Sequence, residues 1–286
     1  QVEKKINNNI ILKVYNKCLY NGRNNILNVK YSIIDNKIKI ESLGGNINWN
    51  SNIFYGIYFQ DKKDKRYIPK KIFLTYKNKR VPKVVLQKYI YLNPNYNISF
   101  SDDHDCYKFL NNYFCSDFAE YFKNIKWGPI KADFWRLCVL YVFGGVYYDI
   151  DINPHASVDT FIEKNTTFST CLDYKNRAMF QAFIATTPEN PILLECLMIM
   201  YLKKFIKRKN YSIMMGTKDM RAVLENNWIG QPFRGDYTYN VKGQKIKILQ
   251  EYSPNGNLGD FKVRYKNRIL FSSRYREYDS SRHQWR

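Results

Sequence analysis

The chain has no run of about eighteen uncharged apolar residues, so its sequence predicts no membrane-spanning helix. Its six cysteines form no Cys-x-x-Cys pair, which argues against a structural zinc site. Signatures of nucleic-acid binding are also missing, because there is no arginine-rich arm, no zinc-finger spacing and no RNP-type motif. Nucleic-acid binding is therefore a minor interpretation of this sequence.

Acidic residues are scarce. The 286 residues contain 25 Asp and Glu against 46 Lys and Arg, which gives a net charge of +21. Such an excess favours anionic partners, among them nucleotide diphosphates, acidic glycans, nucleic acids and membrane surfaces. The abundance of Lys, Asn, Ile and Tyr is also what an AT-rich genome produces, so codon bias is an alternative origin of part of the charge.

The length allows one large domain, or one domain with a small appendage. Residues 1–66 alternate apolar and polar side chains between turn signals, which predicts a β-rich accessory segment. A charged run over residues 60–66 marks the expected boundary, and residues 67–286 form the expected main domain. Because the chain begins at Gln1 and not at Met, we expect a trimmed N-terminus, and both cytoplasm and secretory lumen remain open.

Residues 130–152 carry the strongest functional pattern. Apolar residues recur at three- and four-residue steps with no Gly or Pro before Gly144-Gly145, which predicts a helix that ends at this pair. The next residues, Val146–Ile152, are β-branched or aromatic in most positions and predict one short buried strand. The sequence therefore predicts a helix, a glycine turn and a strand in direct succession.

Three polar side chains of this expected strand, Tyr147, Asp149 and Asp151, should share one face because side chains alternate along a strand. Carboxylates two residues apart lie roughly 6.6 Å apart along an extended strand. One divalent cation with a bound diphosphate can bridge that span. We therefore predict that Asp149 and Asp151 bind Mn²⁺ or Mg²⁺. The plain alternative is a pair of solvated carboxylates at a strand end, and the helix, glycine turn and strand around them disfavour it.

On the expected helix, Asp133 and Arg136 are three residues apart and share a face. One interpretation is an exposed ion pair. The other is that Arg136 donates hydrogen bonds to hydroxyls or phosphate while Asp133 accepts hydroxyls or orients the arginine. The spacing alone favours neither.

Strands and helices are also expected to alternate in the rest of the chain. We expect a strand over 72–76, a helix over 82–91 with proline in its first turn, and a helix start near Asp102 and Asp103, which act as caps. Further strands are expected over 166–172 and 181–186, a helix over 191–208 and a turn over 241–244. His104 beside three aspartates is more simply a solvated side chain than a metal ligand.

The joint pattern of Ala-Asp-x-x-Arg, seven further residues and Gly-Gly-Val-Tyr-x-Asp-x-Asp resembles the DXD-motif glycosyltransferases of family 32, which include the yeast initiating mannosyltransferases. It is also similar to the catalytic domain of the clostridial glucosylating toxins. Weaker similarities begin at Ile68, Asn93, Gln181 and Met214, and Gln181 stands where the family has Asn. The resemblance does not extend to residues 1–66.

The resemblance implies the GT-A fold, an α/β domain with a mixed central sheet flanked by helices, preceded here by the β-rich extension. It implies catalytic roles for Asp133, Arg136, Asp149 and Asp151. The donor-binding residues that it implies are Tyr76, Asp133, Arg136, Tyr147, Asp149 and Trp285. In this family the chain returns to the metal near its end, so His283 is expected to join Asp149 and Asp151 as a metal ligand.

We therefore expect a metal-dependent retaining glycosyltransferase that moves a hexose from a nucleotide-diphosphate sugar to a hydroxyl of a glycan, lipid or protein acceptor. A UDP-sugar is the favoured donor and GDP-mannose the other candidate. A metal-dependent nucleotidyltransferase or nuclease is the alternative, because it also holds phosphates between two aspartates and suits the charge of +21. A glycan-binding protein with a decayed site is disfavoured by the presence of both aspartates.

Overall fold

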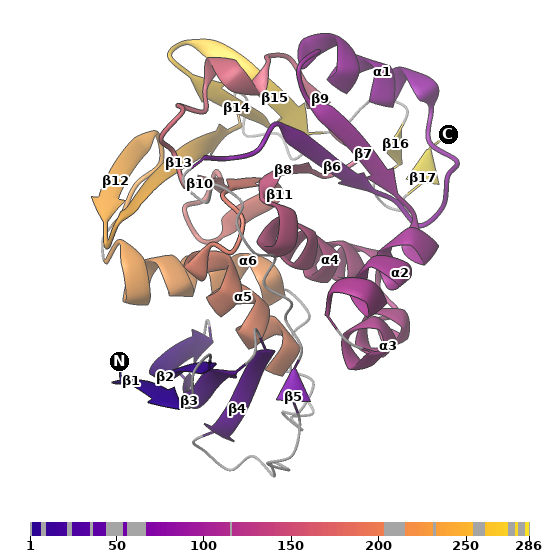
Figure 1. Ribbon diagram of the computed structural model, residues 1–286. Helices are drawn as coiled ribbons and strands as arrows, with labels where there is room; N and C mark the ends of the chain where they lie inside the picture. The colour runs from indigo at the N-terminus through magenta and orange to yellow at the C-terminus, as the bar shows by residue number, and fades with distance from the viewer. Residues whose placement is uncertain are drawn as a thin grey trace.

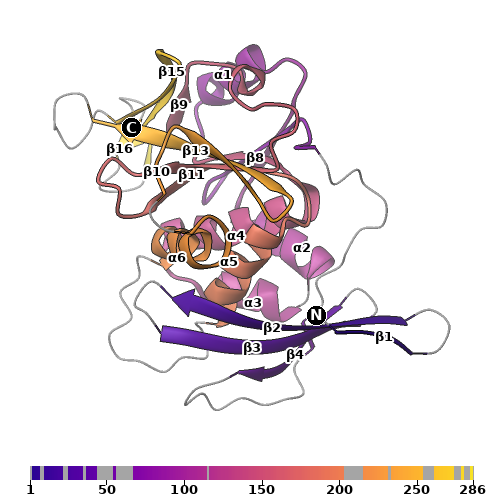
Figure 2. The same ribbon diagram turned by 90° about the vertical axis from the view of Figure 1, so that its left-hand side faces the viewer.

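The computed structural model describes the backbone of residues 2–6, 10–21, 25–34, 37–43, 54–55, 67–114, 116–202, 215–230, 233–253, 261–273, 278–279 and 284–285. Side chains are described within 67–114, 116–201, 216–230, 233–253 and 261–273. Figures 1 and 2 show a mixed sheet with helices on both faces, which confirms the predicted α/β architecture.

The main sheet has the strand order β7-β6-β8-β11-β10-β13-β14-β15-β9, with β12 paired to β13. The pairs β6–β7, β6–β8 and β10–β13 are parallel and the others are antiparallel. The strand bounds are β6 Lys71–Thr75, β7 Asn97–Ser101, β8 Gly145–Tyr148, β9 Ile152–Pro154, β10 Phe168–Leu172, β11 Met179–Thr186, β12 Tyr237–Val241, β13 Gln244–Tyr252, β14 Lys262–Tyr265 and β15 Arg268–Ser273.

This sheet curls strongly. Five strands separate β8 from β9 in the strand order, yet only residues 149–151 join them along the chain. Because four residue steps span at most roughly 14 Å, β9 has to return close to β8. The connection between the two strands is where the Asp-x-Asp sequence lies.

Helices cover both faces of the sheet. They are α1 Lys83–Leu92, α2 Asp103–Tyr113, α3 Ser116–Asn124, α4 Gly128–Phe143, α5 Pro191–Leu202 and α6 Met215–Val223. Helices α2 to α6 pack on one face and α1 on the other (Figure 1). Tyr147 lies in the first core, whereas Val146 and Tyr148 lie in the second, as expected for a central strand with alternating side chains.

Helix α4 ends at Gly144, as predicted. Gly144 and Gly145 both have positive φ angles, +61° and +106°. A Cβ atom on Gly144 would lie 2.6 Å from Pro188, and one on Gly145 would lie 2.8 Å from the carbonyl oxygen of Lys71. The glycine pair therefore permits both the turn and the close approach of β8 to β6.

The prediction of one continuous strand over Val146–Ile152 is wrong. Strand β8 ends at Tyr148, and residues 149–151 form a turn in which the amide of Ile152 donates to the carbonyl of Asp149 at 3.0 Å. The physical reason is a change of partner: β8 pairs with β6 and β11, whereas β9 pairs with β15 at the far edge of the curled sheet. The strand-based spacing of the two aspartates therefore does not apply.

Most other predicted elements form near their expected bounds. The first strand, the proline-led helix and the turn over 241–244 are confirmed as β6, α1 and the hairpin between β12 and β13. Helix α5 starts at Pro191 as expected, and residues 203–208 of its predicted extent lie outside the described residues. The four described cysteines, Cys106, Cys138, Cys171 and Cys196, are free and buried.

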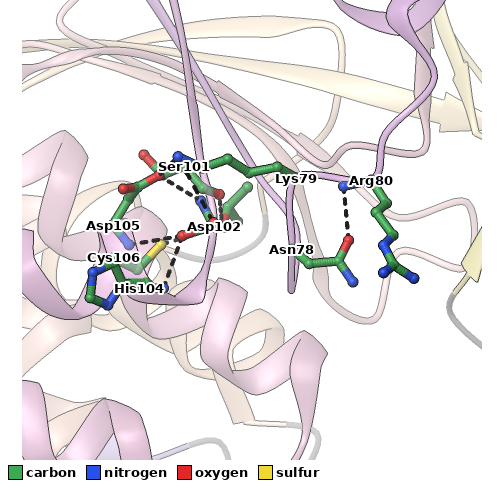
Figure 3. Close-up of polar contacts among 9 residues, drawn as sticks. Asn78, Lys79, Arg80, Ser101, Asp102, His104, Asp105 and Cys106 are labelled. Carbon is green, nitrogen blue, oxygen red and sulfur yellow. Dashed lines mark hydrogen bonds and ion pairs between the residues drawn. The ribbon is translucent and has the colours of Figure 1, made fainter.

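The acidic start of α2 is a helix cap, as predicted. The side chain of Asp102 accepts from the amides of His104 and Asp105, each at 3.0 Å, and the side chain of Asp105 accepts from the amide of Asp102 (Figure 3). This reciprocal arrangement is a capping box. His104 is exposed, in agreement with the prediction of a solvated side chain.

The N-terminal segment contains the antiparallel strands β1 Val2–Ile6, β2 Ile10–Asn21, β3 Asn25–Ile34, β4 Lys37–Leu43 and β5 Phe54–Tyr55. Among the described strands, none of these five pairs with the main sheet, and β2 lies beside α5 and α6 (Figure 2). The division of the chain at residue 66 stays a prediction. Near the C-terminus, β16 Tyr278–Asp279 pairs with β17 Gln284–Trp285. No helix among the described residues is both long and apolar enough to cross a membrane.

Candidate active site

A cavity of about 530 Å³ opens where β6 and β8 end. The residues after these strands form part of its wall, together with the first half of α4 and the start of β11. The polar side chains that line it are Thr75, Tyr76, Lys77, Asp103, Lys131, Asp133, Arg136, Tyr147, Asp149, Asp151, Asp173, Gln181 and Thr217. The cavity therefore gathers side chains that are far apart in the sequence.

The turn over 149–151 presents both aspartates to this cavity. The amide of Asp149 donates to the carbonyl of Ala182 at 2.9 Å, which fixes the start of the turn on β11. Asp149, Ile150 and Asp151 all line the cavity. The prediction that the two aspartates lie together is compatible with this geometry, although a turn and not a strand brings them there.

Arg136 connects the acidic side chains of the site. Its Nη2 atom lies 2.8 Å from Oδ1 of Asp149 and 3.0 Å from Oδ1 of Asp133. Its Nε atom donates to the carbonyl of Ala132 at 3.2 Å, and Nη1 donates to the carbonyl of Gln181. Only 3% of this arginine is exposed. Its guanidinium group therefore orients the two carboxylates and the backbone of β11.

Tyr147 adds a second contact to Asp149. Its hydroxyl donates to Oδ1 of Asp149 at 2.8 Å, and its ring centroid lies 4.6 Å from Cζ of Arg136. Both side-chain contacts of Asp149 use the same oxygen, Oδ1. These contacts hold the carboxylate through one oxygen, and 29% of the side chain remains exposed.

Burial and charge shift the ionisation of this cluster. Burial would lower the pKa of Arg136, but the carboxylates of Asp149, Asp133 and Asp151 outweigh it and raise that pKa. Burial raises the pKa of Asp133 to about 6 despite the nearby Arg136. Burial also raises the pKa of Tyr147 well above its usual value, and the charge of Asp149 adds to this effect. The arginine is therefore always charged, and Asp133 titrates near neutrality.

The donor set fits Mg²⁺ or Mn²⁺ with few protein ligands. Among the described residues, no group of three His, Cys, Asp or Glu side chains could hold a metal ion. Mg²⁺ is usually bound through one or two carboxylates together with substrate phosphates, so Asp149 and Asp151 would suffice. The third predicted ligand, His283, lies outside the described residues.

The structure brings most of the predicted site residues together. The six that line the cavity are Tyr76, Asp133, Arg136, Tyr147, Asp149 and Asp151. Trp285 belongs to β17, but its side chain is not described. The resemblance implied a donor-binding role for Arg136, whereas its contacts favour a positioning role through Asp149 and Asp133. The individual roles stay predictions.

The sequence did not lead us to expect Lys131 on the cavity wall or a hydrogen bond from the side chain of Gln181. Lys131 lies two residues before Asp133 and forms an ion pair with Asp103 at 2.7 Å on the cavity wall. The side-chain amide of Gln181 donates to the carbonyl of Gly216 at 2.6 Å. The sequence holds a signal for Lys131, because a cation in the first turns of a helix is unfavourable unless an acidic partner faces it.

Because Gly216 has no side chain, it leaves room for the side chains of Gln181 and Asp133. A Cβ atom there would lie 2.5 Å from Oε1 of Gln181 and 3.0 Å from Oδ2 of Asp133. We therefore expect Gly216→Ala to lower kcat/KM of the reaction at this site by roughly 10- to 100-fold, since small displacements of positioning groups cost that much. The free energy of unfolding should fall by about 1–3 kcal/mol, because the new methyl group overpacks the buried side chain of Gln181.

The matched control is Gly128→Ala, because Gly128 also lines the cavity but a Cβ atom there meets nothing within 4 Å. The double variant with Gln181→Asn should recover part of the lost activity, because the shorter side chain removes the collision. Equal kinetics for the two alanine variants would contradict the assignment.

Part of this chain is similar in sequence to known proteins. Residues 80–168 match the family model described as "Glycosyltransferase sugar-binding region containing DXD motif". The chain is 28% identical over 139 residues to Mannosyl phosphorylinositol ceramide synthase SUR1 of Saccharomyces cerevisiae, which covers 46% of this chain and 34% of that protein. It is 30% identical over 132 residues to the Initiation-specific alpha-1,6-mannosyltransferase of Candida albicans, which covers 43% and 34%.

The chain thus spans about a third of the length of these curated relatives. Among solved structures it is similar to the PaToxG glycosyltransferase, with a TM-score of 0.44, 20% identity and coverage of 56% of this chain and 70% of that one.

Two Asp-x-Asp sequences fall within the matched residues, and the structure distinguishes them. Asp105 of Asp103-His-Asp105 serves the capping box of α2 and pairs with Lys79 at 3.2 Å. Both aspartates of Asp149-Ile-Asp151 face the cavity beside Arg136. Residues 80–168 are thus similar to the sugar-binding region of the DXD-motif glycosyltransferases, and within that match Asp149-Ile-Asp151 is the Asp-x-Asp sequence with both aspartates on the cavity wall.

Proposed function

We propose that the chain is a metal-dependent glycosyltransferase that moves a hexose from a nucleotide-diphosphate sugar to a hydroxyl group. The observation that carries this proposal is the buried Arg136, which holds Asp149 at 2.8 Å and Asp133 at 3.0 Å on the wall of one cavity. A carboxylate that is held through one oxygen, beside a second carboxylate, suits the binding of a cation and a diphosphate.

Asp149 and Asp151 would hold Mn²⁺ or Mg²⁺, which supplies positive charge to the departing diphosphate when it is bound. Arg136 and Tyr147 keep Asp149 in one orientation, so no reorganisation is needed during the reaction. Asp133 would accept a hydroxyl of the transferred hexose. Tyr76, at the end of β6, would stack on the base of the nucleotide.

The donor and the acceptor are open to direct measurement. Both curated relatives are named for mannosyl transfer, and one of them for a ceramide product. The resemblance to glucosylating toxins favours a UDP-sugar instead. Release of free sugar from UDP-glucose, UDP-galactose, UDP-N-acetylglucosamine and GDP-mannose with Mn²⁺ tests the proposal. Turnover of at least one donor is expected, and turnover of none would contradict it.

We expect the transferred sugar to keep its anomeric configuration, as the resemblance implies. The leaving phosphate would accept the proton of the incoming hydroxyl on the same face of the sugar. Proton NMR of the first-formed hydrolysis product distinguishes the two anomers. An inverted product would rule out this part of the proposal.

The pH dependence of donor turnover should reflect Asp133. Burial raises the pKa of this carboxyl to about 6, so it is protonated below pH 6 and charged above. The charged form is the one that pairs with Arg136 and accepts hydroxyls, so kcat/KM should fall as the pH drops through 6. Asp133→Asn should remove this limb of the profile and leave a lower, flatter rate. An unchanged acidic limb in that variant would assign the titration to another group.

The alternative nucleotidyltransferase or nuclease predicts a different result. It requires cleavage or extension of nucleic acid by the same aspartates, with binding that weakens steeply as salt rises. Incubation with labelled single- and double-stranded DNA and RNA under the same Mn²⁺ conditions would reveal it. We expect no change in the length of these substrates.

A further inference from the structure

Helix α1 presents large apolar side chains to the solvent. Val84, Ile90 and Tyr91 are 62%, 53% and 83% exposed, and we refer to these three residues as the α1 patch. They lie on the outward face of α1 together with Lys83 and Gln87, as the spacing of residues along a helix requires. Single exposed apolar residues are common, whereas three on one ten-residue helix form a candidate interaction surface.

The inward face of α1 is firmly attached to the sheet. Val85 and Tyr89 are completely buried. The hydroxyl of Tyr89 donates to the carbonyl of Ile152 at 2.8 Å, and its ring packs against Tyr148 with centroids 5.2 Å apart. The helix therefore cannot rotate to bury the α1 patch without breaking these contacts.

The surroundings of the α1 patch are basic. Residues 67–101 contain seven lysines and arginines and no aspartate or glutamate. Lys77, Lys79, Arg80 and Lys83 are all exposed and precede or begin the helix. Of these four, Lys79 is paired with Asp105 at 3.2 Å. Lys77 and Arg80 lie in the segment before the helix, and Lys83 is its first residue. Figure 3 shows the side chain of Arg80 pointing away from Asp102 and Asp105, which lie at the start of α2.

We propose that the α1 patch and its basic neighbours dock the chain on an anionic membrane surface. A helix that inserts apolar side chains at the lipid interface while adjacent lysines and arginines contact anionic headgroups is a recognised mode of surface binding. A protein groove or a nucleic acid suits the patch less well. The exposed apolar groups are two aliphatic side chains and one tyrosine, and the charged residues of the segment that contains them, 67–101, are all basic.

Docking in this way would bring the cavity near the lipid. Lys77 lines the cavity, and α1 begins six residues later at Lys83. An acceptor that is itself embedded in the membrane could then reach the site without leaving the bilayer. The docking itself does not depend on the proposed sugar transfer and can be measured with no donor present.

Flotation of the full chain with vesicles tests the proposal. At physiological salt we expect binding to vesicles of phosphatidylcholine with about one-third phosphatidylserine and much weaker binding to pure phosphatidylcholine. The patch variant, Val84→Ser with Ile90→Ser and Tyr91→Ser, should lower the partition coefficient by roughly 10-fold or more. Its matched control is Tyr237→Ser with Ile269→Ser, two exposed apolar residues on the C-terminal strands, which should change it less than twofold.

A second pair of variants separates local charge from net charge. Lys77→Gln with Arg80→Gln and Lys83→Gln should weaken binding to the anionic vesicles by roughly 100-fold. Lys164→Gln, Lys175→Gln and Lys266→Gln remove the same charge from other exposed positions and should weaken it far less. Equal losses in the two triple variants would show attraction by total charge alone and would overturn the proposal.

Insertion of the α1 patch into the lipid can be measured separately, by fluorescence quenching. Tyr91→Trp should gain a fluorescence component that brominated phospholipids quench, whereas the native tryptophans should not be quenched to the same degree. Absence of that quenching overturns the proposal, even if vesicles are bound. A patch variant that keeps vesicle binding but loses binding to single-stranded DNA would also overturn it, in favour of a nucleic-acid surface.

Discussion

Replacing Asp151 with Ala is expected to reduce sugar release from the preferred donor by about 10³-fold, because the departing diphosphate would lose the cation that stabilises it. Asp151 lies in the turn that follows β8 and faces the cavity beside Asp149. The protein should stay folded, since the position is only partly buried. Manganese binding, followed by electron paramagnetic resonance, should weaken together with the activity.

The matched control for this variant is Asp105→Ala, in the other Asp-x-Asp sequence. Asp105 serves the capping box of α2, so its loss should lower the free energy of unfolding by roughly 0.5–1 kcal/mol. Donor turnover and manganese binding should remain. If Asp151→Ala released sugar at the native rate, the assignment of this turn as the metal and diphosphate site would be abandoned.

Replacing Arg136 with Met should have the largest effect on stability. The arginine is 3% exposed and contacts two carboxylates, so its removal leaves Asp133 and Asp149 without their shared cation. Breaking a buried ion pair by removing one partner costs about 3–5 kcal/mol. We expect a loss of that size in urea unfolding, together with strongly reduced donor turnover.

A matched exposed pair provides the control. Lys70 and Asp159 lie 2.7 Å apart, with about half of each side chain exposed. Lys70→Met should therefore change the free energy of unfolding by less than about 1 kcal/mol. Adding Asp133→Asn to Arg136→Met should restore part of the lost stability, because one unpaired charge is then removed. A stable and fully active Arg136→Met variant would show that the arginine positions neither carboxylate.

Local sequence patterns predicted many elements of residues 67–286. The helix that ends at Gly144 and the cap at Asp102 depend on short-range sterics and hydrogen bonds, so they can be recognised from neighbouring residues. The strand over Val146–Ile152 could not be predicted correctly, because its end is set by a change of partner strand from β11 to β15. Such a change depends on residues more than a hundred positions away along the chain.

The candidate site was likewise predicted only in part from the sequence. Residue type and spacing identified Asp149 and Asp151 as a pair, because two carboxylates after a glycine turn are rarely placed there for packing. They did not reveal that Arg136 is enclosed by the carbonyl of Gln181 and two carboxylates. That arrangement requires α4 to cross the start of β11, which only long-range packing decides.

The sequence by itself determined which residues can carry the chemistry, since charge, ligand type and glycine permissiveness are properties of individual residues and their neighbours. The tertiary structure alone decided which oxygen of Asp149 is held, which side chains share the cavity and which face of α1 meets the solvent. The physical reason is that the curl of the main sheet brings β9 back to β8, and no local pattern encodes that closure.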